Sequence, residues 1–312
     1  MSDESQLRFG SGRAICYSGY REGQSPSTGI FPSYEQIRED LLILHDQWRY
    51  LRLYDCSEHA KIVLEVIRKE KLNFKLMLGA SIGAEVSNPG CPWGGSYPES
   101  VLESNRRNNE NEVSRLIELA NLYPEMVFSL SVGNEATVDW TDHLVPVGRV
   151  VEYVRMVKKG ARQPVTFCEN YVPWLGKLEI LGNEVDFISL HTYPIWEFKN
   201  ISEAMSFTIE NYSSVARKYP GKPVSITEAG WTTSSNGRGM RLEDANEDNQ
   251  KTYLDNLVRW AEKKSILCFV FEAFDEPWKG SSDPMEPEKH WGLYRVNRKP
   301  KKVMDQFHST RV

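Results

Sequence analysis

Two glutamates in this chain occupy matching positions, each directly after an apolar stretch and among small residues. Glu135 lies in SVGNEA and Glu228 in SITEAGW. Two carboxyl groups about 5–5.5 Å apart suit cleavage of a glycosidic bond with retention of configuration, and about 6.5–9.5 Å suits inversion. A structural ion pair is the alternative for either glutamate alone, but it accounts poorly for both. The pair therefore indicates acid–base chemistry.

The apolar stretches before these glutamates belong to a series that runs along the whole chain. Several are nearly continuously apolar, as strands buried on both faces require. Helical patterns lie between them, and Ser33 with Gln36 forms a capping box before one of these patterns. The predicted strands cover 14–17, 50–54, 74–78, 127–132, 165–168, 185–190, 224–227 and 266–271. The further predicted helices cover 59–69, 113–122, 147–159, 203–218 and 249–263.

Eight strands separated by helices predict the α/β class and a closed, parallel (β/α)8 TIM barrel, which needs about 250 residues. The remaining length would lie in long loops such as 81–100. A doubly wound open sheet is the alternative, but it usually has fewer strands and a glycine-rich first turn. The first turn here reads SGYR. Because no linker or repeat divides the chain, we expect residues 1–312 to form a single catalytic domain.

In such a barrel the carboxyl ends of the strands face the active site. Polar residues occur at these predicted ends beside the two glutamates, namely Arg52, Asn134, Asn170, His191, Tyr193 and Glu276. Buried charges need partners, so their concentration supports a site. Asn170 and His191 are interpreted as candidates for substrate contacts, with His191 as a hydrogen-bonding residue at the rim.

Four blocks in this order, SVGNEA, ISLHTYP, ITEAGW and FEAFDEPWKG followed by EKHWGLY, resemble glycoside hydrolase family 17. That family comprises β-1,3-glucanases and related glucanosyltransferases on a (β/α)8 barrel. The resemblance extends from about residue 15 to residue 303. GYREGQSPSTG and NPGCPWGG resemble its bacterial and fungal branches more than the plant enzymes. One block alone would be weak, whereas four in order are specific.

The resemblance implies roles for individual residues. Glu135 matches the acid/base, Glu228 the nucleophile, and Asn134 the residue that binds the sugar 2-hydroxyl. Arg52 and Tyr193 match residues beside the nucleophile, where a cation and a phenol would keep Glu228 ionised.

The resemblance also implies a supporting acidic–basic pair near the acid/base, formed by Glu276 and Lys279. Glu288 matches the family as well. One catalytic carboxyl must be protonated while the other is ionised, so their environments must differ. We expect Glu276 to raise the pKa of Glu135 and Arg52 to lower that of Glu228.

The chain has nine tryptophans, and most of them lie in or beside predicted loops. A flat apolar ring suits the CH-lined face of a pyranose, and ligand sites combine such walls with a few polar groups. The predicted substrate-binding aromatics are Trp231 and Trp278, then Trp174, Trp196 and Trp291, and with less weight Tyr17 and Tyr20. Buried packing is the alternative for each of them.

Composition and spacing argue against several other functions. The net charge is −5 with dispersed basic residues, so nucleic-acid binding is not expected. The longest apolar run, 266–271, is far shorter than the roughly 20 residues of a membrane span. The five cysteines form no CxxC pair, and the histidines show no HExxH spacing. We therefore expect no metal, no cofactor and no membrane contact.

These observations predict a monomeric retaining glycosidase that acts on a β-1,3-glucan such as laminarin through Glu135 and Glu228, with endo action as the first choice. A β-1,3-glucanosyltransferase is the alternative, since it shares the first half-reaction. A catalytically silent glucan-binding barrel is a third hypothesis, which would require loss of either glutamate. Polymer degradation implies export to the periplasm or beyond the cell, with any signal missing from this sequence, because MSDESQLRFG contains no apolar signal segment. Otherwise a cytoplasmic protein is expected.

Overall fold

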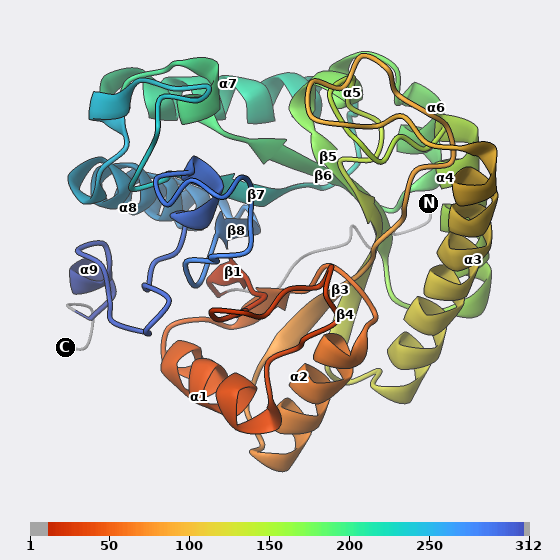
Figure 1. Cartoon of the computed structure of the whole chain (residues 1–312), viewed down its shortest axis with the longest axis horizontal. Coiled ribbons are helices and arrows are strands. Elements are labelled where there is room, and N and C mark those ends of the chain that lie inside the picture. Colours follow the sequence, from red (N-terminus) through yellow and green to blue (C-terminus); the bar gives the residue numbers. More distant parts are fainter. Residues whose placement is uncertain (1–11, 309–312) are drawn as a thin grey trace, which may run out of the picture.

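The computed structural model describes residues 12–308, which form a closed barrel of parallel strands in sequential order (Figure 1). The first strand pairs with the second and also with the last, so the sheet closes on itself. The strands are β1 (Ala14–Cys16), β2 (Tyr50–Arg52), β3 (Lys75–Ala80), β4 (Val127–Asn134), β5 (Val165–Asn170), β6 (Ile188–Thr192), β7 (Val224–Gly230) and β8 (Cys268–Phe271). The predicted (β/α)8 barrel is confirmed.

The helices form an outer ring around these strands in Figure 1. They are α1 (Tyr34–His45), α2 (Glu58–Lys69), α3 (Glu99–Leu122), α4 (Val147–Gly160), α5 (Tyr171–Leu175), α6 (Glu179–Glu184), α7 (Ile201–Lys218), α8 (Glu247–Lys264) and α9 (Met304–His308). The predicted capping box is confirmed, because Ser33 Oγ accepts from Gln36 N and the Gln36 side chain accepts from Ser33 N. Between residues 12 and 308, no helix is long and apolar enough to cross a membrane.

Helix α3 is longer than the sequence pattern predicted, since it begins at Glu99 rather than at residue 113. Its first half is polar, and polar side chains hold it against the barrel. Asn109 Nδ2 donates to Gly83 O and to Glu85 Oε1 over 2.9 Å each, and the buried Glu112 accepts from the backbone N of Cys56. Hydrophobic periodicity does not detect a helix that is held in this way.

Strands β4 to β7 extend two to three residues further toward the carboxyl end of the barrel than predicted. Glu228 therefore lies within β7, where it is in register with His191 of β6. The pleat of an extended strand fixes the direction of each side chain, so these ends are rigid supports for polar groups.

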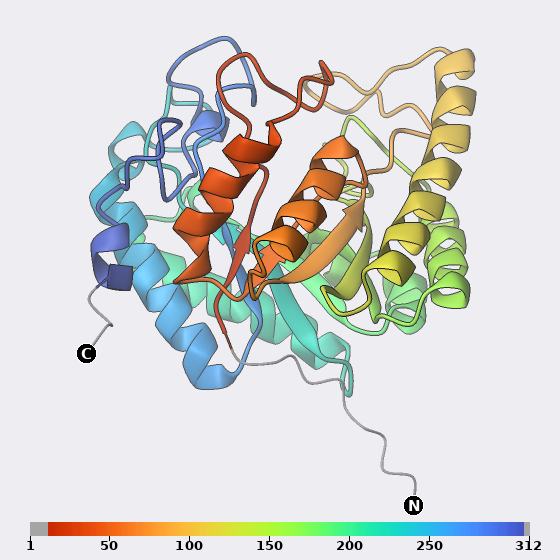
Figure 2. The same cartoon turned by 90° about the horizontal axis from the view of Figure 1, so that it is seen from below.

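Long connections gather at one end of the barrel, and Figure 2 shows those after β1, β3 and β8 there together. The chain that follows β8 is fixed by two buried ion pairs. Lys301 Nζ lies 2.7 Å from Asp275 Oδ1, and Arg298 contacts both carboxylate oxygens of Asp40 over 2.7 Å. These pairs join the last part of the chain to the loop after β8 and to α1.

Candidate active site

Glu135 and Glu228 come together at the carboxyl end of the barrel. Glu135 follows β4 directly, and Glu228 lies in β7. One carboxylate oxygen of each lies within 4.8 Å of the other, and His191 Nδ1 lies within the same distance of both. A nearest-oxygen distance of this size is closer to the separation of about 5–5.5 Å between the carboxyl groups of retaining glycosidases than to the about 6.5–9.5 Å of inverting ones.

Glu228 is surrounded by hydrogen-bond donors, and only 6% of its side chain is exposed. Arg52 Nη1 donates to Glu228 Oε1 over 2.5 Å, and Tyr54 OH donates to the same oxygen over 3.0 Å. Tyr193 OH donates to Glu228 Oε2 over 2.5 Å. Burial alone would raise the pKa of Glu228. The charges of His191 and Arg52, together with these hydrogen bonds, outweigh burial and lower that pKa to about 2. The predicted effect of Arg52 thus has the expected direction.

Arg52 also fixes the orientation of Asn134. Arg52 Nη2 lies 2.5 Å from Asn134 Oδ1, and because a guanidinium can only donate, the facing atom of the amide is its oxygen. Tyr54 supports the guanidinium, whose carbon lies 4.4 Å from the centre of the phenol ring. The NH₂ group of Asn134 is therefore turned away from Arg52 and can donate to a hydroxyl beside the carboxylate pair.

Glu135 has a different environment from Glu228. Its side chain is 26% exposed, and Oε1 lies 2.8 Å from His191 Nδ1. Its backbone has a φ of 46°, in the left-handed region that residues with a Cβ rarely adopt. The two carboxyls thus differ in exposure and in their donors, which is the asymmetry that an acid and a nucleophile require.

His191 lies between the two carboxylates and is fully buried, so the prediction of a substrate contact at the rim is corrected. Its Nδ1 is 2.8 Å from Glu135 Oε1 and 3.4 Å from Glu228 Oε2. Burial would lower the pKa of His191, but the charge of Glu228 and the hydrogen bonds around the ring raise it to about 10. The imidazole therefore carries a proton that it shares with the carboxylates.

Glu135, His191 and Glu228 also form the group of potential metal ligands that the structure contains within residues 12–308. Carboxylates and imidazole are suitable donors by type. In this structure the three groups are bonded to one another and to Arg52, since His191 Nδ1 contacts Glu135 Oε1 and Arg52 Nη1 donates to Glu228 Oε1. They form a hydrogen-bonded network.

The expected Glu276–Lys279 pair is present, and Lys279 joins a second carboxylate to it. Lys279 Nζ lies 3.1 Å from Glu276 Oε2 and 2.5 Å from Glu272 Oε2. Glu272 follows β8 and is buried, and burial raises its pKa although Lys279 opposes the shift. Because Lys279 balances the charge of Glu276, the expected effect of Glu276 on the pKa of Glu135 stays a prediction.

Glu288 lies on a neighbouring turn, Pro287–Lys289, with 34% of its side chain exposed. Its Oε1 is 3.9 Å from Arg238 Nη2. Burial raises the pKa of Glu288, while Lys279 and Arg238 lower it and Glu135 raises it further. Glu288 thus belongs to the charged surroundings of the carboxylate pair, and its role stays a prediction.

Three of the five predicted tryptophans have no exposed surface and cannot stack on a sugar. Trp174, Trp231 and Trp291 are fully buried. The indole N–H groups of the first two donate to backbone carbonyls, and Trp291 packs edge-on against Tyr193 with ring centres 5.1 Å apart. The prediction is corrected for all three because their rings are enclosed by neighbouring segments, as Trp174 of α5 is by Phe167 and Tyr219.

The remaining predicted tryptophans are partly exposed. Trp278 is half-buried, and its Nε1 donates to Glu276 Oε2 over 3.1 Å. Trp196 is also half-buried, with the guanidinium of Arg238 5.1 Å from its ring centre. Of the two, Trp278 is bonded directly to the carboxylate that pairs with Lys279.

Tyr17, Tyr20 and Asn170 are buried and have contacts within the fold, and their predicted contacts with substrate stay predictions. Tyr17 OH donates to the Asp40 carboxylate over 3.1 Å, and the ring of Tyr20 stacks on His59. Asn170 Oδ1 accepts from a backbone N of α5 and so caps that helix.

Sequence reasoning missed Tyr54 and two exposed tryptophans. Tyr54 lies two residues after Arg52, and this spacing along a strand indicates the same face. Trp93 and Trp140 are 59% and 38% exposed on the loops after β3 and β4. Asn88 and Cys91 join these loops by hydrogen bonds to backbone carbonyls of 139, 140 and 141. No sequence pattern separated them from the buried tryptophans.

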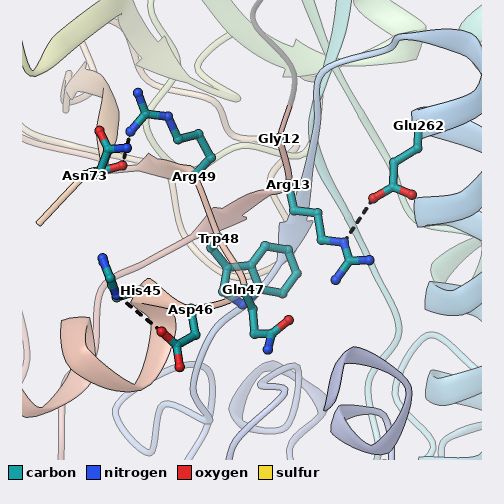
Figure 3. Close-up of a pocket in the computed structure, with 9 residues that line it drawn as sticks. All are labelled: Gly12, Arg13, His45, Asp46, Gln47, Trp48, Arg49, Asn73 and Glu262. Carbon is teal, nitrogen blue, oxygen red and sulfur yellow. Dashed lines mark hydrogen bonds and ion pairs between the residues drawn. The ribbon is translucent and has the colours of Figure 1, made fainter. Parts of the chain in front are cut away.

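A pocket of about 440 Å³ lies at the opposite end of the barrel, before β1, β2 and β3 (Figure 3). Figure 3 shows that two of the cations in its wall are already paired, Arg13 with Glu262 over 3.0 Å and Arg49 with the carbonyl of Asn73. In barrels of this type the amino-terminal end of the strands serves stability rather than chemistry. This pocket is therefore separate from the carboxylate site.

Comparison with known proteins shows that the sequence and the fold are similar to those of glycoside hydrolases. A family model described as the BtgE/BtgC glycoside hydrolase domain matches residues 14–292. A glucan 1,3-beta-glucosidase of Arthroderma benhamiae is 28% identical over 136 residues, which cover 39% of this chain and 43% of the relative. A putative glucan endo-1,3-beta-glucosidase, btgC of Aspergillus niger, is 25% identical over 286 residues, which cover 84% of this chain and 38% of the relative. The chain thus spans less than half the length of these relatives.

Two solved structures share the architecture. An endo-laminarinase from Formosa Hel1_33_131 has a TM-score of 0.83 and 28% identity, with 95% of this chain and 86% of that chain covered. A glycoside hydrolase family 17 beta-1,3-glucanosyltransferase from Rhizomucor miehei has a TM-score of 0.71 and 22% identity, with 93% and 95% covered. The second comparison shows the fold alone.

Proposed function

The chain belongs to the BtgE/BtgC glycoside hydrolase domain family, and from this premise we propose that it is an endo-acting β-1,3-glucanase that cleaves laminarin-like chains with retention. The observation that carries the proposal is the pair Glu135 and Glu228, whose nearest oxygens lie within 4.8 Å of each other in contrasting environments. The relatives and the Formosa structure, which are named for β-1,3-glucan or laminarin cleavage, support the choice of substrate.

In the first half-reaction, Glu228 is the nucleophile and Glu135 is the acid. An oxygen of ionised Glu228 attacks the anomeric carbon, the bond from that carbon to the leaving oxygen breaks, and Glu135 gives its proton to that oxygen. Because His191 Nδ1 contacts Glu135 Oε1, the proton is donated from Oε2. The product is a glycosyl ester on Glu228 and a released chain.

In the second half-reaction, Glu135 acts as the base. It takes a proton from water while the water oxygen attacks the anomeric carbon, and Glu228 leaves as a carboxylate. Arg52, Tyr54 and Tyr193 stabilise that carboxylate. Two inversions restore the original configuration, and the Asn134 amide donates to the sugar 2-hydroxyl in both steps.

Exposed rings near this centre are suited to hold the glucan chain. Trp278 is bonded to Glu276, the carboxylate that pairs with Lys279. Trp140 lies five positions after Glu135, on the loop that is joined to the loop of Trp93. We assign Trp93 and Trp140 to the leaving chain, because the acid stands on the leaving-group side of the bond that breaks. An exported location follows from a polymeric substrate and is part of the same proposal, which cell fractionation would test.

A time course on a reduced β-1,3-gluco-oligosaccharide tests the proposal. Product sizes are followed by mass spectrometry and the configuration of the first product by NMR. We expect shorter products in the β configuration, none with Glu228→Ala, and unchanged products with Glu112→Gln, a buried glutamate of α3 that serves as the matched control. Products longer than the substrate would instead assign the glucanosyltransferase. An inert wild-type protein would refute the β-1,3-linkage or the catalytic claim.

A further inference from the structure

The segment after Glu135 folds into a compact loop, residues 135–146, whose two ends are joined. Val145 N donates to Ala136 O over 2.8 Å. The buried carboxylate of Glu169 accepts from the backbone N of Thr137 over 2.9 Å and from its hydroxyl over 2.6 Å. The loop therefore has a fixed shape next to the acid/base.

His143 reaches back from this loop to the peptide bond that joins Asn134 to Glu135. Its Nε2 lies 2.8 Å from Asn134 O. On the other side of the same peptide, Glu135 N donates to Cys168 O of β5 over 2.9 Å. Both polar groups of this one peptide are held, one by the neighbouring strand and one by His143.

The peptide needs these contacts because Glu135 has a left-handed backbone, with a φ of 46°. For a residue with a Cβ this conformation costs energy, and it persists only where the surroundings fix it. The side-chain amide of Asn134 precedes this peptide bond along the chain, and the side-chain carboxyl of Glu135 follows it. A rotation of the peptide would therefore move the Glu135 carboxyl relative to the bond that is cleaved, whereas Arg52 holds the Asn134 amide independently.

The groups around His143 require a proton on both ring nitrogens. Nε2 faces a carbonyl oxygen, which can only accept, and Nδ1 lies 2.7 Å from the carboxylate of Asp142. Burial would lower the pKa of His143, but the hydrogen bonds to Asp142 and to Asn134 O outweigh burial and raise it. Asp142 and Glu135 are the charged groups that face the ring.

We propose that His143 is a positioning residue for proton donation by Glu135, because it clamps the Asn134–Glu135 peptide in the conformation that presents the acid to the leaving oxygen. This inference rests on the proposed function. His143 does not touch the reacting atoms, so its effect must depend on how much the reaction needs the acid.

Two substrates separate this role from a structural one. A reduced laminari-oligosaccharide has a poor leaving group that needs a proton, whereas 2,4-dinitrophenyl β-laminaribioside releases a phenolate that does not. The variants are His143→Ala and His143→Gln, whose amide can still donate to Asn134 O. His45→Ala is the matched control, since His45 also pairs with an adjacent aspartate, Asp46, over 3.4 Å, at the opposite end of the barrel.

We expect His143→Ala to lose about 100-fold in kcat/KM on the oligosaccharide, within the range of about 10²–10⁴ that a general acid contributes. On the dinitrophenyl substrate the expected loss is less than about threefold, because no acid is needed in the step that kcat/KM reports. His143→Gln should recover most of the loss on the oligosaccharide, and His45→Ala should match wild type on both substrates. In the wild type, ¹⁵N NMR of the imidazole at neutral pH should show both nitrogens of His143 protonated.

Equal losses of kcat/KM on the two substrates would overturn the inference in favour of a general structural role. Wild-type kcat/KM of His143→Ala on the oligosaccharide would also overturn it, and so would a neutral His143 ring in the NMR spectrum. In each of these cases wild-type activity on the oligosaccharide would leave the proposed function intact. A wild type that is inert on both substrates would refute the proposed function and this inference with it.

Discussion

Replacing Tyr193 or Tyr54 by phenylalanine removes one hydrogen-bond donor from Glu228 and keeps the packing of the ring. Tyr193 OH lies 2.5 Å from Glu228 Oε2, and Tyr54 OH lies 3.0 Å from Oε1. Hydrogen bonds to charged groups contribute about 1.5–3 kcal/mol, and 1.36 kcal/mol corresponds to about one pKa unit. Each substitution is therefore expected to raise the pKa of Glu228 by about one to two units, with the larger effect at Tyr193 because its contact is shorter.

The direction of the effect on activity follows from the ionised form of the nucleophile. Donors favour the carboxylate and keep the pKa of Glu228 low, at about 2. Removing a donor favours the protonated form, which cannot attack. The acid limb of the pH profile of kcat/KM should therefore move to higher pH, from about 2 in the wild type to roughly 3–4 in Tyr193→Phe.

The assay measures kcat/KM on the dinitrophenyl substrate between about pH 2 and 7, where Glu228 changes from protonated to ionised. Each sample is also returned to neutral pH after exposure, so that irreversible denaturation is recognised. Tyr212→Phe is the matched control, since this tyrosine packs on Trp260 at the outer helices. If the acid limbs of wild type, Tyr193→Phe and Tyr54→Phe coincide, these donors do not set the ionisation of Glu228 and the reasoning is refuted.

Three further outcomes are expected. Glu135→Ala should lose activity on oligosaccharides but recover with added azide on the dinitrophenyl substrate, giving a β-glycosyl azide; an α-product would contradict retention. Lys301→Met should lower the free energy of unfolding in urea by about 3–5 kcal/mol, because it leaves Asp275 buried and unpaired; a change below about 1 kcal/mol would contradict the role of the pair. Trp231→Ala should lower the free energy of unfolding by about 3–5 kcal/mol with little change in KM, whereas Trp278→Ala and Trp140→Ala should raise KM. A raised KM in Trp231→Ala alone would overturn the assignment of buried and exposed rings.

The order of the strands and the position of the two glutamates were readable from the sequence because both depend on local pattern. Strands buried on both faces are continuous apolar runs, and a carboxylate directly after such a run lies at the carboxyl end of a barrel strand. The polar part of α3 before residue 113 left no such pattern, since only Leu102 among its buried residues is apolar and Asn109 and Glu112 make its buried polar contacts.

The surroundings of the glutamates were less predictable because they depend on how distant segments meet. A tryptophan in a loop has the same local sequence whether the loop exposes it, as at Trp93, or folds over it, as at Trp231. Tyr54 resembles a core residue of the predicted strand 50–54, and its contact with Glu228 joins positions 174 residues apart. His143 lies in a polar loop where only the backbone path reveals that its ring reaches Asn134 O.

The pairing of β1 with β8 constrains the order in which the chain can fold during synthesis. Both site glutamates have been translated once β7 has been made, but β1 lacks one of its two neighbours until Phe269 and Val270 emerge from the ribosome. Open strand edges pair readily with other chains, and contacts between distant parts of the sequence form slowly. A nascent chain of this protein therefore remains prone to aggregation until most of it has been translated. Slower translation before β8 would prolong that exposure, whereas a chaperone that covers β1 and β7 would shorten it.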